Sequence, residues 1–207
     1  MSGVPTRRAF LAMGVATVAG TAGCLGQVTD RDCPDGQRSV DHPVAGDPDA
    51  DVTVLSFEDY TCGGCRTFVQ EHFPLLEAEY VDPGRVRYEH REFPVTGDEW
   101  SWLVPNATLA VLEDAGTDVY WEYAKEVYGL FGNYSADGLA ALADDLGASP
   151  DAVRSAVEEE PFCAHIAEDQ EEGEERGVDR TPTVLVNGDA VENPSAPNVA
   201  DAIEAEL

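Results

Sequence analysis

The fold is decided by the stretch DVTVLSFEDYTCGGC, residues 51–65. Most of residues 51–57 are apolar or β-branched, which is typical of a buried strand. Beyond the two cysteines, apolar residues recur at helical spacing, at Val69, Phe73, Leu76 and Tyr80. Pro83-Gly84 ends this helix, and residues 85–90 predict a second strand. A strand, a helix and a strand joined so closely form a right-handed unit with parallel strands.

The rest of the chain is mainly helical and ends in a hairpin. Apolar spacing is helical from about residue 98 to 178, and Ser149-Pro150-Asp151 is a typical helix start. Asn187-Gly188 lies between the apolar runs 183–186 and 189–191 and predicts a two-residue hairpin turn. One stripe of a final helix carries Val199, Ile203 and Leu207. The expected order is strand–helix–strand, a helical block, then strand–strand–helix, which is an α/β fold.

Cys62 and Cys65 have the spacing that disulfide exchange requires. The reaction needs one thiolate that attacks and a second thiol close enough to release the partner. Two cysteines three positions apart at a helix start are neighbours, and the first faces the positive end of the helix dipole. We therefore predict that Cys62 is the nucleophile and Cys65 the resolving cysteine. Gly63 and Gly64 contribute flexibility and backbone N–H groups.

Two other interpretations of the cysteine pair stay open. A structural zinc site needs a second pair of ligands, and Cys163-Ala164-His165 is the only candidate. An inert structural disulfide would also join two cysteines so close together. The strand before the pair and the helix after it favour the redox interpretation. We assign no metal or organic cofactor, since the histidines show no metal-binding spacing; they are His42, His72, His90 and His165.

Several further motifs occur in a fixed order along the chain. They are residues 57–66 around the cysteines, Pro74, residues 80–84, residues 120–123, and residues 177–183, which contain Thr181-Pro182. Over roughly residues 43–207 the chain resembles the DsbA-like branch of the thioredoxin superfamily. The resemblance implies a thioredoxin-like fold whose two halves, βαβ and ββα, flank a helical insertion at about 98–178. It also implies the activity of a protein thiol–disulfide oxidoreductase.

The resemblance implies roles for residues around the pair. In that family the bond before the proline at Pro182 is cis, and the proline packs against the active cysteines. Neighbouring backbone, here that of Thr181, binds an extended substrate peptide. Asp59 matches an acid that is common in the family, which relays a proton if buried and caps or solvates if exposed. Arg180 would lie near Cys62, where a cation favours the thiolate, and an exposed Arg180 is the alternative.

Two positions depart from the family pattern. Gly64 stands where strongly oxidising members carry a histidine, so the sequence gives no reason to expect a very low pKa for Cys62. Ser56 stands where thioredoxins carry a buried acid, so their proton relay does not carry over. Oxidase, reductase and isomerase directions therefore stay open. So do two other classes of function, a metal carrier and a binding module without turnover.

The charge of the chain is extreme, with 12 Lys+Arg against 41 Asp+Glu and a formal net charge of -29. Such a chain repels itself in dilute buffer. In molar salt the Debye length falls to about 3 Å and the repulsion is screened. We interpret the protein as that of a halophile, of archaeal origin. The same charge excludes nucleic acid and anionic membrane surfaces as partners.

The first 23 residues indicate targeting rather than folding. Arg7-Arg8 precede a short apolar run and resemble a twin-arginine export signal. Thr21-Ala22-Gly23-Cys24 resembles a lipobox, which would make Cys24 the lipidated anchor on the outer face of the membrane. The polar residues 24–50 predict a tether, which leaves residues 51–207 as the thioredoxin-like domain.

Export predicts an oxidising compartment and the partners that belong there. Cys33 and Cys163 are candidates for a structural disulfide, with a buried free thiol as the alternative for Cys163. The expected partners are reduced or misfolded exported proteins and a membrane redox protein that resets the CGGC pair. Asn133 and Asn106 match the N-glycosylation pattern, and Asn106 falls inside a predicted helix.

Overall fold

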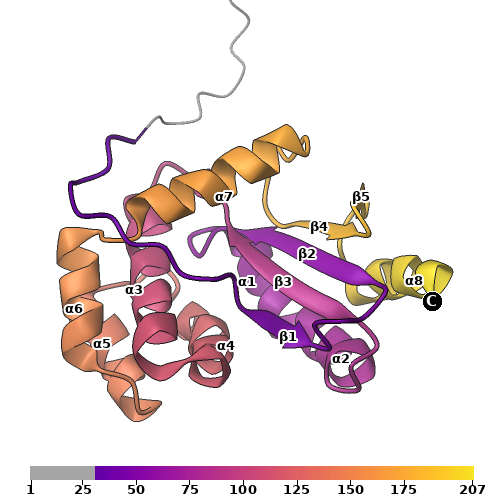
Figure 1. Ribbon diagram of the computed structural model, residues 1–207, viewed down its shortest axis with the longest axis horizontal. Helices are drawn as coiled ribbons and strands as arrows, with labels where there is room; N and C mark the ends of the chain where they lie inside the picture. Colours follow the sequence, from indigo (N-terminus) through magenta and orange to yellow (C-terminus); the bar gives the residue numbers. More distant parts are fainter. Residues whose placement is uncertain (1–30) are drawn as a thin grey trace, which may run out of the picture.

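The computed structural model describes residues 31–207, so the export signal, Cys24 and the first part of the predicted tether lie outside the described residues. A five-stranded sheet forms the centre, in the order β1-β3-β2-β4-β5 (Figure 1). The strands are β1 (Val44–Gly46), β2 (Thr53–Glu58), β3 (Arg87–Glu92), β4 (Thr183–Val186) and β5 (Asp189–Ala190). β2 and β3 are parallel, and the other neighbours are antiparallel. The predicted thioredoxin-like α/β fold is confirmed.

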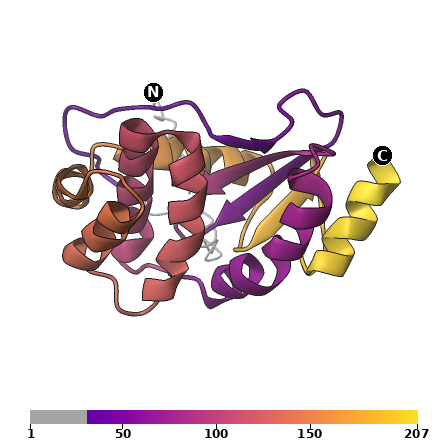
Figure 2. The same cartoon turned by 90° about the horizontal axis from the view of Figure 1, so that it is seen from below.

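Helices cover both faces of the sheet (Figures 1 and 2). One face carries α7 (Cys163–Glu175). The other carries α8 (Ala196–Glu206) and the helix that follows CGGC. That helix runs through α1 (Gly63–Thr67), η1 (Phe68–His72), α2 (Phe73–Leu76) and η2 (Glu77–Val81). Side chains alternate between the two faces along β2, so the core has a part on each face of the sheet. Leu55 and Phe57 face α7, whereas Val54 faces the CGGC helix.

The helix after CGGC buries the predicted stripe, whose members are Val69, Phe73, Leu76 and Tyr80. It contains two π-helical turns, η1 and η2. Pro74 has no N–H to donate to the carbonyl four residues earlier, so the regular ladder is interrupted beside it. This helix therefore keeps its apolar face on the sheet in spite of an internal proline.

The helical insertion packs as a group at one end of the sheet (Figure 1). Its members are α3 (Trp100–Ala115), α4 (Thr117–Glu126), η3 (Val127–Leu130), α5 (Ala136–Asp145) and α6 (Pro150–Glu159). Ser149 caps α6 as predicted, since its Oγ accepts a hydrogen bond from the N–H of Ala152. Asn106 is fully buried in α3, so glycosylation at this position is excluded and Asn133 is left as the candidate.

The hairpin β4–β5 turns at Asn187 and Gly188, as predicted. Both residues have positive φ, 49° and 93°, which a tight two-residue turn of this kind requires. The segment before β4 carries Thr181 and Pro182, so the hairpin fixes that segment to the sheet.

The prediction of a tether over residues 24–50 is wrong for the part that the structure describes, which begins at residue 31. Residues 31–46, the N-terminal strap, pack along α7 and end in β1, which pairs with β3. A disulfide joins Cys33 to Cys163, and the Arg38 N–H donates to the carbonyl of Pro161 at 2.7 Å. The side-chain oxygen of Gln37 accepts from the N–H of Ala164 at 2.8 Å and so caps α7. The strap is held mainly by hydrogen bonds, strand pairing and a disulfide, which its polar composition does not reveal.

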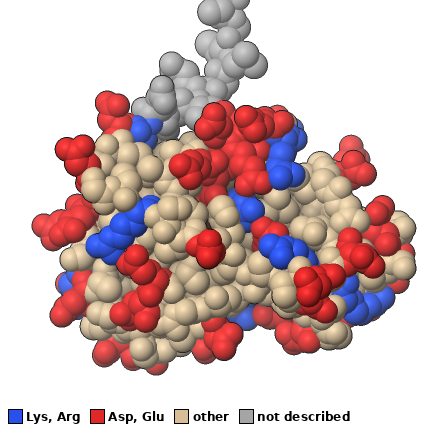
Figure 3. All heavy atoms as spheres, in the orientation of Figure 1, with Lys and Arg blue, Asp and Glu red and all other residues tan. Residues whose placement is uncertain are grey.

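On the face seen in Figure 3, acidic side chains are widely spread and basic ones are fewer. Among the helices of residues 31–207, none combines the length and apolarity needed to span a bilayer.

Candidate active site

Cys62 lies at the junction between a strand and a helix. β2 ends at Glu58, and Cys62 is the N-cap residue of α1. The Cys62 N–H donates to the carbonyl of Asp59 at 2.9 Å, which closes the turn between the two elements. Cys62 is half-buried and Cys65, one turn later, is fully buried. Of the two thiols, only that of Cys62 is accessible to another molecule.

The pKa of Cys62 is lowered to about 5. The main cause is a hydrogen bond with the Cys65 thiol, and the backbone N–H groups of Cys65 and Gly64 act in the same direction. These contacts outweigh the cost of partial burial. The helix N-terminus favours a thiolate for the same reason. An acidic Cys62 therefore arises here without a histidine at position 64.

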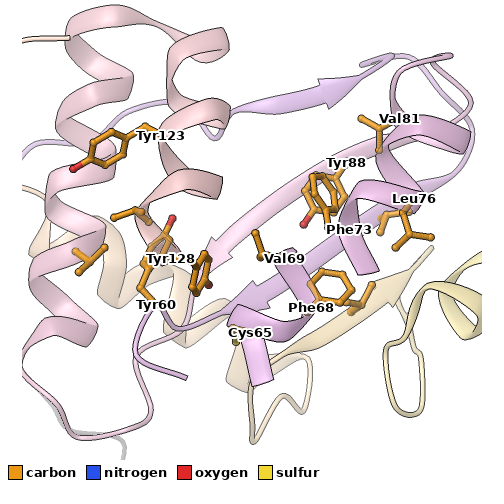
Figure 4. Close-up of a cluster of buried hydrophobic side chains, with 14 of the residues drawn as sticks. Tyr60, Cys65, Phe68, Val69, Phe73, Leu76, Val81, Tyr88, Tyr123 and Tyr128 are labelled. Atoms are coloured by element: carbon orange, nitrogen blue, oxygen red, sulfur yellow. The ribbon is translucent and has the colours of Figure 1, made fainter. Parts of the chain in front are cut away.

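The pKa of Cys65 is raised far above its ordinary range. Burial is the main cause, followed by the hydrogen bond with Cys62 and the negative charge of Glu58. The Asp59 N–H donates to the sulfur of Cys65 at 3.4 Å and opposes this shift. Figure 4 shows Cys65 at the start of its helix, in the same buried cluster as Tyr60 and Tyr128. At neutral pH the reduced pair is thus a thiolate at Cys62 above a protonated thiol at Cys65.

The bond between Thr181 and Pro182 is cis, as the resemblance implies. The sulfur of Cys62 lies 3.4 Å from the carbonyl oxygen of Thr181, so this segment reaches the pair. A Cβ added to Gly64 would lie 3.1 Å from Cδ of Pro182 and 3.6 Å from the sulfur of Cys62. Glycine at this position therefore allows the proline to approach closely. Gly63 is exposed beside it.

Asp59 is buried, which is the condition for a proton relay, but its carboxylate makes hydrogen bonds with other partners and none with the Cys65 thiol. It accepts hydrogen bonds from the N–H groups of Thr61, Val95 and Thr96 and from the hydroxyls of Thr61 and Ser101. These contacts tie the CGGC turn to the segment after β3 and to α3. Of the two roles open for Asp59, the structure favours capping over proton relay.

The side chain of Arg180 does not contact Cys62, so of the two positions left open for it, beside the nucleophile or exposed, the first is not found. Its guanidinium pairs with Asp179 at 2.7 Å, and 79% of the side chain is exposed. The exposed alternative is the one the structure has. An arginine next to a carboxylate in an open loop pairs locally, at almost no desolvation cost.

Glu58 is a buried acid near the cysteine pair, and the sequence analysis did not single it out. Its side chain is 1% exposed and accepts hydrogen bonds from Ser56 Oγ at 2.6 Å and from the Tyr128 hydroxyl at 3.1 Å. Ser56 and Glu58 are two residues apart on β2 and share the face toward the CGGC helix. Ser56 thus stands where thioredoxins carry a buried acid, and its hydroxyl helps to hold the carboxylate of Glu58, two residues further along the strand. The two-residue period of the strand was the signal that could have found Glu58.

A second buried charged pair lies on the neighbouring strand, β3. Nε2 of His90 is 3.4 Å from Oε2 of Glu92, and both side chains are buried. Burial disfavours the His90 cation, but Glu92 and then Glu58 outweigh it and raise the pKa of His90 to about 9. The His90 ring also stacks on Tyr60, with centroids 5.9 Å apart. The sheet therefore carries a protonated histidine beside Glu92, and Glu58 also stabilises its charge.

The second pair of ligands that a zinc site at CGGC would need is not available. Cys163 is bonded to Cys33 with a Cα–Cα distance of 5.5 Å, so its sulfur cannot join Cys62 and Cys65 on an ion. Of the two alternatives for Cys163, a disulfide to Cys33 and a buried free thiol, the structure has the disulfide.

A family model described as Thioredoxin matches residues 38–205. The chain belongs to the thioredoxin family. The match begins inside the N-terminal strap, in agreement with the packing of this segment on the domain.

Relatives of this thioredoxin-family chain are known in bacteria. Disulfide bond formation protein D of Bacillus subtilis (strain 168) is 26% identical over 184 residues, which cover 85% of this chain and 82% of that protein. The crystal structure of oxidised BdbD from Bacillus subtilis superposes with a TM-score of 0.74 at 24% identity, covering 85% of this chain and 98% of that one. A thioredoxin-like oxidoreductase from Silicibacter pomeroyi DSS-3 gives 0.66 at 28% identity, covering 79% and 91%. The DsbA-like resemblance is confirmed, and the protein is a thiol–disulfide oxidoreductase.

Proposed function

We propose that this protein introduces disulfide bonds into exported proteins through the Cys62–Cys65 pair. One observation carries the proposal: an accessible thiol whose pKa is lowered to about 5 stands next to a buried thiol whose pKa is raised. A stabilised Cys62 thiolate favours the reduced pair, and a pair that is stable when reduced is an oxidant toward other thiols. The relatives named for disulfide bond formation support the same direction.

The exchange proceeds in two steps. A substrate thiolate attacks the sulfur of Cys62 in the Cys62–Cys65 disulfide, and Cys65 leaves and takes up a proton. A second substrate thiolate then attacks the substrate sulfur of the mixed disulfide, and Cys62 leaves as a thiolate. The substrate loses two electrons and two protons, and the CGGC pair gains the electrons. The low pKa of Cys62 makes it a good leaving group in the second step.

The segment around Thr181 and Pro182 is proposed to hold the substrate backbone beside Cys62. A hollow of about 310 Å³ opens next to Thr61 and offers room for a neighbouring substrate side chain. Its lining residues are Thr61, Asp98, Trp100, Phe131, Gly132 and Tyr134. Such a mixed aromatic and acidic lining suits apolar or basic side chains.

The reaction is proposed to take place outside the cytoplasm. Arg7-Arg8 and the apolar run behind them support export by the twin-arginine route, and Cys24 supports a lipid anchor on the outer face of the membrane. In this scheme a membrane redox protein reoxidises the CGGC pair after each turnover. Reduced or misfolded exported proteins are the substrates.

The test is to trap the mixed disulfide. In a Cys65→Ala variant no neighbouring thiol can attack Cys62 to release a partner, so partners without a second free thiol in reach should stay bound to Cys62 and run as adducts that dithiothreitol removes. The matched control is the double variant Cys62→Ser, Cys65→Ala, which lacks the sulfur that forms the mixed disulfide and should trap nothing. Absence of adducts in cells grown under oxidising conditions, or equal adducts in the control, would contradict the proposal.

A further inference from the structure

Three ligand-type side chains meet where the N-terminal strap crosses α7. They are His42 from the strap and His165 and Asp169 from α7. One candidate ligand atom of each side chain lies within 4.8 Å of the other two. His165 and Asp169 are four residues apart and so share one face of the helix. His42 comes from a segment 123 residues earlier in the sequence, so the spacing along the chain could not predict this cluster.

The cluster contains a polar atom that the protein itself does not satisfy. His165 is 3% exposed, and its Nε2 is buried without a hydrogen-bond partner in the described residues. Its Nδ1 lies 3.4 Å from the hydroxyl of Ser39, and its ring centroid is 4.8 Å from that of His42. Native proteins rarely leave a buried nitrogen unpaired, and ion binding is one established use of such an atom.

The carboxylate of Asp169 is already oriented for this role. Its Oδ2 accepts a hydrogen bond from the N–H of Glu92 at 3.0 Å, and its Oδ1 faces His42 Nε2 at 2.6 Å. Outer contacts of this kind hold a carboxylate in place for an ion. Arg91 is 3.8 Å from Oδ1, but it makes shorter ion pairs to Glu172 at 2.7 Å and to Glu89 at 2.9 Å. The charge of Arg91 is therefore balanced elsewhere, and Asp169 can serve another cation.

We propose that His42, His165 and Asp169 bind a divalent transition ion of the zinc class. Two imidazoles and one carboxylate suit Zn²⁺, Co²⁺ or Ni²⁺, whereas Ca²⁺ and Mg²⁺ prefer sets of oxygen ligands. Ligands on one such ion lie about 2 Å from it, hence at most about 4 Å apart. Small side-chain rotations bring the three atoms to that separation. The ion replaces the direct contact between His42 and Asp169.

The ion is structural and separate from the exchange reaction. The three ligands lie on the α7 side of the sheet, and the CGGC helix lies on the other side (Figure 1). His42 stands between Cys33, which is bonded to Cys163, and β1, which is paired with β3. The ion thus adds a third fixed point to the strap, between the disulfide and the strand.

The experiment uses the oxidised protein, in which the CGGC thiols are closed and cannot bind metal. Protein stripped with a chelator is titrated with Co²⁺, followed by its visible absorption and by the paramagnetic shifts of histidine ring protons. We expect one Co²⁺ per chain, displacement by Zn²⁺, and shifted ring signals of His42 and His165. His42→Ala should weaken binding at least tenfold, and His72→Ala, on the other face of the sheet, should leave it unchanged.

Three results would overturn the proposal. They are absence of stoichiometric binding, equal affinity in His42→Ala, and shifted signals from His72 or His90 instead of His42 and His165. The proton shifts are measured on the wild-type protein, so they decide the matter even if a variant folds poorly. The test does not depend on the proposed oxidase activity, since no thiol takes part in it.

Discussion

At the residue scale, the chemistry of the pair comes from where each sulfur lies. Cys62 is the N-cap residue of α1 and half-buried, and Cys65 is buried one turn later. The same cysteine type therefore gives a thiolate at one position and a protonated thiol at the other. Gly64 contributes no charge. Because it has no side chain, Pro182 and the sulfur of Cys62 can both lie close to its backbone.

The acidity of Cys62 can be measured by alkylation of the reduced protein. The rate should titrate with a midpoint of about 5 and be flat at neutral pH, whereas an ordinary cysteine titrates at about 8.5. Since the folded pKa is lowered, the reduced protein gains stability as pH rises from about 5 to about 8.5, and it loses this stability on acidification. In Cys62→Ser the acidic phase should vanish. A midpoint near 8.5 in the wild type contradicts the site described above.

Glu58 acts on Cys65 by its charge. Its carboxylate is held by Ser56 and Tyr128 and makes no hydrogen bond to the sulfur. Glu58→Gln should therefore lower the pKa of Cys65 and shorten the life of the mixed disulfide at pH 7, because each pKa unit changes the thiolate fraction tenfold. Quenched-flow trapping with a model peptide measures that life. The exposed Glu122 gives a control, Glu122→Gln, that should change nothing. A longer life in Glu58→Gln would show instead that Glu58 accepts the proton of Cys65.

At the element scale, local signals predicted the elements they belong to. The periodicity of residues 69–80, the Ser149 cap and the Asn187-Gly188 turn each depend on near neighbours, and each appears in the structure. The sequence predicts a tether instead of the strap because its partners are distant in sequence: β3 begins about 40 residues after β1, and the contacts with α7 span more than a hundred residues. Glu58 was missed because the predicted strand ends at Phe57, whereas β2 extends one residue further and includes Glu58. For Arg180 the sequence leaves open a position beside Cys62 and an exposed one, and the structure has the exposed one, where Arg180 pairs with the neighbouring Asp179.

The disulfide of the strap should stabilise the whole domain. It closes a loop with a sequence separation of 130, and removing a native disulfide typically costs roughly 2–5 kcal/mol. The double variant Cys33→Ala, Cys163→Ala avoids a lone thiol that would react with CGGC. Its free energy of unfolding should fall by that amount in denaturant titration, while the reactivity of Cys62 is unchanged. Dithiothreitol should destabilise the wild type more than the double variant. Equal stability of the two oxidised proteins would contradict this.

At the scale of the whole molecule, the charge governs stability. The chain carries a net charge of -29, and acidic side chains are scattered over the face seen in Figure 3. Raising NaCl from about 0.1 M should raise the unfolding temperature steeply, and the gain from screening should level off near 1 M, where the Debye length is about 3 Å. Calorimetric scans across this range check it, and KCl should act like NaCl. An unfolding temperature that is flat or falls with salt contradicts the interpretation.

The central claim is that the stabilised Cys62 thiolate makes the pair an oxidant. Its direct test is the reduction potential of Cys62–Cys65, measured in molar salt by equilibration with glutathione and mass analysis of the two redox forms. The expected value is less negative than about −200 mV, toward the about −120 mV of DsbA. A value near the about −270 mV of thioredoxin would mean that the pair works as a reductant and would contradict the proposed function.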